Sequence, residues 1–235
     1  MPAETASLPE PLYLFADSQL LFWKRNGQLL LETVLKNCEG EAPRAAYIGA
    51  SNADRQEYYE IFAGAMQAAG IGERRKIDSS FSAPDRDYLQ AARLIVLAGG
   101  DVRRGWEVFK QTGMKEIILE RRARGAILVG ISAGAVQLGR QAVIETAGSS
   151  SRELLDLFDL VPAIVDVHDE RHNWARLSGF IHLLEGASVG LGIPSGGGVI
   201  AHPDGTLEPL RRPAHEFRFS AVGVAHSLLC PPEND

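Results

Sequence analysis

Short apolar runs alternate with amphipathic stretches through the first part of this chain. Residues 12–15, 44–49, 74–77, 94–97 and 126–130 predict strands, and most of these read as continuous apolar runs. Residues 28–35, 54–69, 84–92 and 102–124 predict helices, the last one interrupted near Gly113. Buried strands that alternate with helices are typical of a parallel sheet covered on both faces. The pattern therefore predicts an α/β fold, a three-layer sandwich with a mostly parallel central sheet.

The last third of the chain has a different pattern. Residues 163–168 predict a strand that ends at a histidine, and residues 173–185 predict a helix. Two short apolar runs, 199–202 and 206–208, flank the turn Pro203-Asp204-Gly205, which predicts an antiparallel hairpin near the C-terminus. Residues 216–219 and 222–225 predict further strands. We expect a single domain over residues 1–235, with its core within about 12–210.

The pentapeptide Gly130-Ile131-Ser132-Ala133-Gly134 lies between a predicted strand and a predicted helix. Strand, sharp turn at a serine, and helix are the parts of a nucleophile elbow, in which glycines relieve crowding and the serine hydroxyl stands clear of the sheet. Free N–H groups at the start of the helix would stabilise an oxyanion. The alternative interpretation is an ordinary strand-to-helix turn in which Ser132 is the helix N-cap.

Other candidate groups stand at the ends of predicted strands. Ligands of open α/β sheets bind beyond the carboxyl ends of the strands. A serine nucleophile there needs a base, and His168 is the one histidine of six that ends an apolar strand of the predicted parallel part. The N–H groups of Gly100 and Ala133 would form a two-donor oxyanion hole. The plainer interpretation of Gly99-Gly100 is a pair of glycines that closes a tight turn.

A metal site is the second chemical interpretation of the same region. His168 and His172 are four residues apart, a spacing that allows two histidines on one helix face to bind zinc. The metalloprotease pattern requires glutamate directly after the first histidine, and Asp169 stands there instead. His168 also ends a strand rather than lying on a helix. We therefore expect no metal and no other cofactor.

Composition narrows the class of protein. The chain has 235 residues, of which 45% are hydrophobic and 23% charged, as in ordinary globular proteins. A net charge of −6 without a basic block argues against nucleic acid as a partner. Cys38 and Cys230 lie far apart, which favours a reducing compartment. Residues 1–11 lack the pattern of a signal peptide, and no apolar run has the length of a membrane span. We expect a cytoplasmic protein without a membrane partner, for which a homodimer is one candidate assembly.

These motifs, in this order, resemble the peptidase E and cyanophycinase family. The likeness covers about residues 12–210 and rests on the Gly-Gly-Asp turn at 99–101, on Gly130–Ala135 and on Asp166–Leu177. The family resembles the class I glutamine amidotransferases in fold, with serine at the elbow in place of cysteine. Its members are serine peptidases with a Ser-His-acid triad. Peptidase E removes an N-terminal aspartate from dipeptides, and cyanophycinase cleaves β-Asp-Arg units.

The resemblance implies roles for individual residues. It makes Ser132 the nucleophile, His168 the base, and Gly100 with Ala133 the oxyanion hole. The candidate substrate-binding residues are Arg171, Arg176 and Asp101, and either arginine could pair with a substrate carboxylate. Cyanophycinases have glutamine where this chain has Val102 and Val167, and a further arginine where it has Asn173. The resemblance therefore favours a short peptide over cyanophycin as the substrate.

The third member of the triad is the open point. The family's acid follows a strand similar to Val189–Ile193, and the matching residue is Ser195, with no carboxylate between Glu185 and Asp204. Ser195 could orient His168 as a neutral acceptor. A carboxylate from elsewhere could substitute, and Asp166 is favoured because residues i and i−2 of a strand share a face. Or the chain has lost peptidase activity and binds an acidic peptide or amino acid.

The sequence thus predicts a serine peptidase that acts on short peptides, with an aspartyl-dipeptidase-like specificity among the candidates. The alternative is a catalytically impaired relative that binds a ligand.

Overall fold

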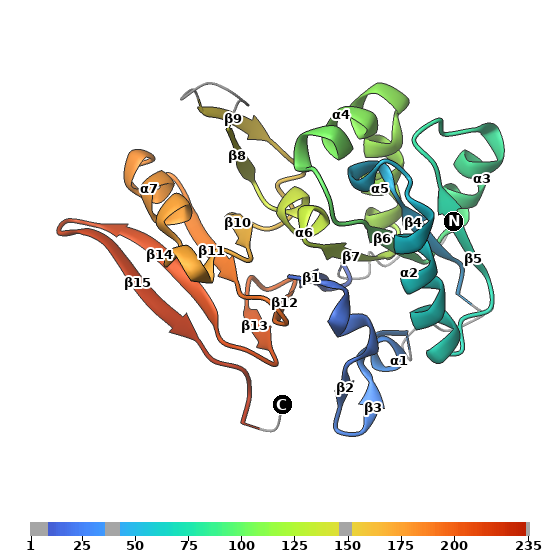
Figure 1. The fold of residues 1–235 in the computed structure, drawn as a ribbon, viewed down its shortest axis with the longest axis horizontal. Coiled ribbons are helices and arrows are strands. Elements are labelled where there is room, and N and C mark those ends of the chain that lie inside the picture. Colours follow the sequence, from blue (N-terminus) through green and yellow to red (C-terminus); the bar gives the residue numbers. More distant parts are fainter. Residues whose placement is uncertain (1–8, 36–42, 146–151, 234–235) are drawn as a thin grey trace, which may run out of the picture.

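The computed structural model describes residues 9–35, 43–145 and 152–233, and a seven-stranded sheet forms its centre (Figure 1). The strand order is β13-β12-β1-β7-β6-β4-β5. The parallel part consists of β1 (Leu12–Phe15), β7 (Ile127–Ile131), β6 (Leu94–Leu97), β4 (Ala45–Ile48) and β5 (Arg74–Ile77). The hairpin of β12 (Gly198–Ala201) and β13 (Leu207–Leu210) continues the sheet in antiparallel pairing. The predicted mostly parallel sheet and the C-terminal hairpin are confirmed.

Successive residues of the central strands enter two separate cores. Ala45 and Tyr47 of β4 pack with Phe62, whereas Ala46 and Ile48 pack in the core that contains Trp106. Helices α1 (Leu30–Leu35) and α2 (Gln56–Ala68) cover the first face. The other face carries α3 (Ala83–Ala91), α4 (Val102–Thr112), α5 (Met114–Ala123) and α6 (Ala133–Leu138). Burial on both faces explains the continuous apolar runs and confirms the three layers.

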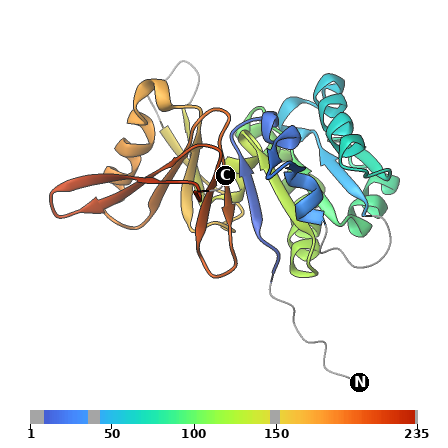
Figure 2. The same cartoon turned by 90° about the horizontal axis from the view of Figure 1, so that it is seen from below.

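A second sheet lies beside the first, which the sequence analysis does not predict (Figure 2). It consists of β10 (Ala163–Val167), β11 (Val189–Ile193), β14 (Ala214–Ser220) and β15 (Gly223–Leu229), and α7 (Ala175–Leu183) packs against it. The strand before His168 is parallel to β11, but it belongs to this separate sheet. One apolar core includes side chains of both sheets, among them Leu14, Val165 and Leu191.

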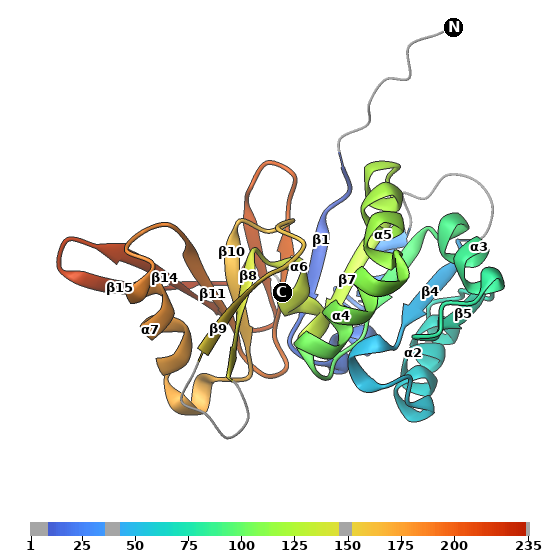
Figure 3. The same ribbon diagram turned by 90° about the horizontal axis from the view of Figure 1, so that it is seen from above.

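Some elements have boundaries that differ from the predicted ones, and others are not predicted from the sequence. Residues 28–29 pair as β3 (Gln28–Leu29) with β2 (Lys24–Arg25), so the first helix begins only at Leu30. The sequence also does not predict the short helix η1 (Ser18–Phe22). Nor does it predict the hairpin of β8 (Gln141–Glu145) and β9 (Arg152–Asp156), which lies beside β10 in Figure 3. The break at Gly113 is confirmed. Residues 36–37 of the first predicted helix region and Cys38 lie outside the described residues.

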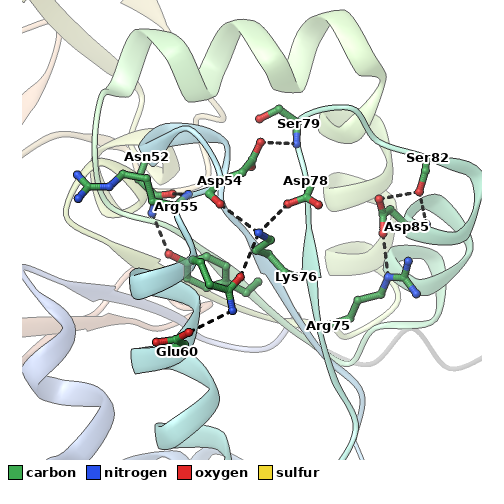
Figure 4. Close-up of polar contacts among 12 residues, drawn as sticks. Asn52, Asp54, Arg55, Glu60, Arg75, Lys76, Asp78, Ser79, Ser82 and Asp85 are labelled. Atoms are coloured by element: carbon green, nitrogen blue, oxygen red, sulfur yellow. Dashed lines mark hydrogen bonds and ion pairs between the residues drawn. The ribbon is translucent and has the colours of Figure 1, made fainter.

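A polar network fixes the turn that follows β4 (Figure 4). The Asn52 side-chain amide donates to the Tyr47 hydroxyl at 2.9 Å, and Asp54 accepts from the Ser79 N–H at 2.9 Å. Lys76 of β5 donates to the Asp54 carbonyl oxygen at 3.1 Å. The network holds the short helix η2 (Ala50–Asn52) at the carboxyl ends of the strands, where the candidate site lies. No helix within the described ranges has both the length and the apolar character needed to cross a membrane.

Candidate active site

Ser132 stands at a strained turn between β7 and α6. Its backbone has φ 50° and ψ −111°, a conformation that costs a residue with a side chain about 1–3 kcal/mol. A Cβ at position 130 would lie 2.5 Å from the Gly134 backbone, and one at position 134 would collide with the Leu97 carbonyl oxygen. The two glycines are therefore required by the turn. Ser132 occupies the N-cap position of α6, as the alternative interpretation expects, but its side chain makes no capping hydrogen bond, so the hydroxyl is not used to cap the helix.

The glycine turn after β6 lies directly against Ser132. A Cβ at Gly99 would be 3.2 Å from the Ser132 Cβ. Gly100 has φ 134°, and a side chain there would collide with the Ser51 carbonyl oxygen. Ala133 is the first residue of α6, so its N–H has no partner within the helix. The two predicted oxyanion-hole residues thus flank the serine from two separate elements.

A buried side chain joins these two elements. Gln137 of α6 is fully buried, and its amide donates to the Ser51 hydroxyl at 3.1 Å and to the Val102 carbonyl oxygen at 3.0 Å. The Asp101 N–H donates to the Ser51 carbonyl oxygen at 2.8 Å. The Asp101 carboxylate caps α4 by accepting from the Arg104 N–H at 2.7 Å. Asp101 therefore lines the site, and its carboxylate positions the turn.

His168 follows β10 and faces the loop after β11. Its Nδ1 lies 3.2 Å from the Ser195 Oγ. The loop is anchored to the central sheet, because the Gly196 N–H donates to the Asp17 carboxylate at 2.6 Å. Of the three accounts that the sequence leaves open, the contact favours Ser195 as the group that orients the histidine.

Asp166 is committed to a different partner. Its carboxylate accepts two hydrogen bonds from the Arg176 guanidinium, at 2.5 Å and 3.2 Å, and one from the Val167 N–H at 2.9 Å. Burial raises the pKa of Asp166, and the Arg176 guanidinium opposes that shift. The shared face expected for residues 166 and 168 fails because β10 ends at Val167 and His168 has φ 61°. The structure therefore pairs Asp166 with Arg176 rather than with the histidine.

Glu170 is a residue that the sequence analysis misses. Its Oε1 accepts from the Ser195 N–H at 3.2 Å, so it lies behind the serine that contacts His168. Partial burial raises the pKa of Glu170. Hydrogen bonding from Ser195 and electrostatic attraction to His168 have the opposite and larger effect, so the pKa of Glu170 lies below its usual value. In the sequence, Glu170 is notable only because it follows His168 by two residues. That spacing does not indicate a contact with Ser195, which lies in a loop distant in the chain.

Two cavities meet at the serine and the histidine. Both are lined by Gly100, Ser132 and His168. The larger, of about 400 Å³, also contains the Asp166–Arg176 pair and an apolar wall that includes Phe180. The smaller, of about 280 Å³, is lined by aromatic side chains and Asp17, and its aromatic members are Tyr47, Tyr58 and Phe62. A substrate that occupied both cavities would lie across Ser132.

The remaining predicted residues lie apart from this centre. Arg171 is exposed and lines neither cavity. His172 lies on the short helix η3 (Glu170–His172), and its Nδ1 is 2.8 Å from an Asp169 oxygen, whereas His168 precedes that helix. The two histidines therefore do not share a helix face. Within the described ranges, no group of three or more His, Cys, Asp or Glu side chains is arranged to hold a metal ion.

Comparisons with known proteins agree on the kind of protein that this chain is similar to. The model of peptidase family S51 matches residues 16–202. An uncharacterized peptidase of Bacillus subtilis strain 168, YgaJ, is 27% identical over 118 residues. That match spans 49% of this chain and 50% of the relative, so it covers about half of the relative's length.

Two solved structures share the fold. A peptidase from an acI-B1 actinobacterium superposes with a TM-score of 0.69 at 15% identity, covering 97% of both chains. A putative peptidase E protein from Listeria monocytogenes EGD-e gives a TM-score of 0.56 at 18% identity, covering 94% of this chain and 99% of that one. At these identities the likeness establishes the fold, and the chemistry has to be argued from the residues described above.

Proposed function

The chain belongs to peptidase family S51, and we propose that it is a serine peptidase that hydrolyses short peptides. The observation that carries this proposal is the strained Ser132, whose hydroxyl is not used as a helix cap and which shares two cavities with His168. A backbone strain of this kind persists only where the surrounding structure holds it, and such residues cluster at active sites.

In the proposed mechanism, Ser132 Oγ attacks the scissile carbonyl carbon while the His168 Nε2 accepts its proton. The carbonyl oxygen becomes an oxyanion, which the N–H groups of Gly100 and Ala133 stabilise. Each such donor contributes on the order of 3–4 kcal/mol. His168 then donates the proton to the leaving amine, and the C–N bond breaks. Water, activated by the same histidine, hydrolyses the acyl-enzyme and regenerates Ser132.

The cavities support a short substrate. Their volumes of about 400 and 280 Å³ suit a few residues in total rather than an extended chain. The larger cavity contains Arg176, which is a candidate partner for a substrate carboxylate. We therefore keep an aspartyl-dipeptidase-like specificity as the first substrate class to examine, with Arg176 rather than the exposed Arg171 as the recognition residue.

The test of the proposed function is turnover of a dipeptide and tripeptide set by three forms of the protein. The wild type and Ser227→Ala, a control at an exposed serine of β15, should release the same products. Ser132→Ala should lower kcat by several orders of magnitude, because the nucleophile is gone. Equal turnover by Ser132→Ala and the wild type would contradict the proposal.

A second candidate function follows from Ser195. Because a neutral side chain contacts the His168 Nδ1, the site is also compatible with a catalytically impaired protein that binds an acidic peptide or amino acid. Calorimetry with the same peptide set discriminates the two. Binding without release of products by the wild type favours the binding protein, and release of products favours the peptidase.

A further inference from the structure

The contact between His168 and Ser195 does not supply the negative charge that usually stabilises a catalytic histidine. During attack the imidazole becomes an imidazolium ion, and a negative charge beyond Nδ1 stabilises that ion and fixes the ring tautomer. A serine hydroxyl carries no net charge. It can accept a hydrogen bond from Nδ1–H, and it retains its own O–H to donate onward.

Glu170 is the carboxylate that contacts Ser195. Its Oε1 accepts from the Ser195 N–H at 3.2 Å. Its Oε2 is buried and has no hydrogen-bond partner among the residues that the structure describes. Burying a charged oxygen without a hydrogen bond costs free energy unless the surrounding charges and dipoles stabilise the ion. Glu170 therefore places a negative charge beside Ser195.

The other nearby carboxylates each bind a different partner, although Asp169 Oδ2, like Glu170 Oε2, is buried without a hydrogen-bond partner within the described residues. Asp166 binds the Arg176 guanidinium, and Asp169 contacts the His172 Nδ1 at 2.8 Å. Asp17 accepts from the Gly196 and Gln19 N–H groups, at 2.6 Å and 2.9 Å. Of these acids, Glu170 is the one with a contact to Ser195, the residue beside the histidine.

We infer that Glu170 is a positioning residue that acts on His168 through Ser195, so that His168, Ser195 and Glu170 together replace the histidine–acid pair of a triad. This inference rests on the proposed peptidase function. In this arrangement the His168 Nδ1–H donates to the Ser195 Oγ, and the Glu170 carboxylate, which accepts from the Ser195 N–H, attracts the Ser195 O–H dipole. No proton is transferred along this chain, and the proton taken from Ser132 stays on Nε2 until the leaving amine accepts it. The carboxylate acts by its charge and by aligning the hydroxyl.

A double-mutant cycle on peptide hydrolysis tests the inference. Glu170→Gln keeps the size of the side chain and removes its charge, so kcat should fall about tenfold or more while KM stays within about twofold. Ser195→Ala should lower kcat at least as much, because it interrupts the contact. In the double variant, Glu170→Gln should cause little further loss, since the route to His168 is already broken. Glu216→Gln, a partly buried carboxylate paired with Arg218 on β14, is the matched control and should leave kcat unchanged.

The results separate this inference from the proposed function. If Glu170→Gln keeps the wild-type kcat, or if its effect and that of Ser195→Ala multiply in the double variant, the inference is overturned while the peptidase function stands. If Ser132→Ala turns over peptide as the wild type does, the proposed function itself fails. Thermal melts of all variants identify any loss of folding, and the cycle still applies to kcat values corrected for the folded fraction.

Discussion

At the scale of single residues, the candidate site depends on contacts around His168 between segments that lie apart in the chain. Ser132 is visible because a five-residue motif carries it, and His168 because it ends an apolar run. Strand periodicity favours Asp166 as the partner of His168, yet β10 ends one residue before His168, whose positive φ takes it off the shared face. Glu170 and Ser195 meet only through tertiary contact, so no local pattern announces them.

The Asp166–Arg176 pair leads to a stability prediction. Arg176→Met leaves a buried carboxylate without its cation, and we expect the free energy of unfolding at pH 7 to fall by about 2 kcal/mol. Burial raises the folded-state pKa of Asp166 above its unfolded value, and removal of the arginine raises it further. The folded variant then binds a proton more readily than the unfolded chain does. The deficit should therefore shrink as the pH falls through the folded-state pKa of this group.

Urea denaturation of the wild type and Arg176→Met at pH 7 and pH 5 measures this effect. Asp166→Asn/Arg176→Met, which lacks the charge, is the control and should show a smaller pH-dependent deficit than Arg176→Met. A deficit in Arg176→Met that is equal at both pH values would show that Asp166 is not the titrating group.

At the scale of elements, the parallel strands β1, β4, β6 and β7 are predictable because each is buried along its whole length. Helices such as α2 and α4 are predictable because each buries one face. The turn at Ser132 is predictable too, because the glycines at 130 and 134 mark where the backbone segments approach each other closely. Elements shaped by a neighbouring segment are not predictable in this way. Residues 28–29 have helical neighbours in the sequence but pair with β2 as a strand.

Two glycine substitutions test the elbow against an ordinary helix position. Gly134→Ala places a methyl group against the Leu97 carbonyl oxygen, so we expect a loss of about 1–3 kcal/mol in stability and a loss of activity as the turn shifts. Gly179→Ala, within α7, meets no heavy atom within 4 Å and should stabilise the protein by about 1 kcal/mol. Chemical denaturation and peptide turnover of both variants give the comparison. Similar behaviour of the two variants would argue against a sterically required glycine at the elbow.

At the scale of the whole molecule, the site lies where two sheets meet. Ser132 and Gly100 follow strands β7 and β6 of the seven-stranded sheet, whereas His168 and Ser195 follow strands of the four-stranded sheet. The sequence predicts one sheet, because β10 and β11 have the same apolar character as the central strands. Strand pairing across long separations is decided by packing, which the run of residues alone does not reveal. The geometry of the site therefore depends on how the sheets are joined.

Arg140 follows α6, and its side chain binds the segments that precede β10 and β11 of the four-stranded sheet. Its guanidinium contacts Asp159 at 3.2 Å, the Ala187 carbonyl oxygen at 3.0 Å and the Ser188 hydroxyl at 3.3 Å. Arg140→Ala should lower the free energy of unfolding by about 1 kcal/mol, which corresponds to a fall in Tm of about 2–4 °C. Differential scanning calorimetry measures this change. Arg218→Ala, which removes an ion pair within one strand of the outer hairpin, should lower Tm by less.

Covalent labelling of Ser132 tests most directly whether this serine is an activated nucleophile. A fluorophosphonate reacts with a serine that a neighbouring base activates, and it forms a stable adduct without requiring the right substrate. After proteolysis and mass spectrometry, we expect one adduct, on the peptide that contains Ser132, with much slower formation in His168→Ala and none in Ser132→Ala. An unlabelled wild type, or a label on another serine that persists in Ser132→Ala, would contradict this expectation.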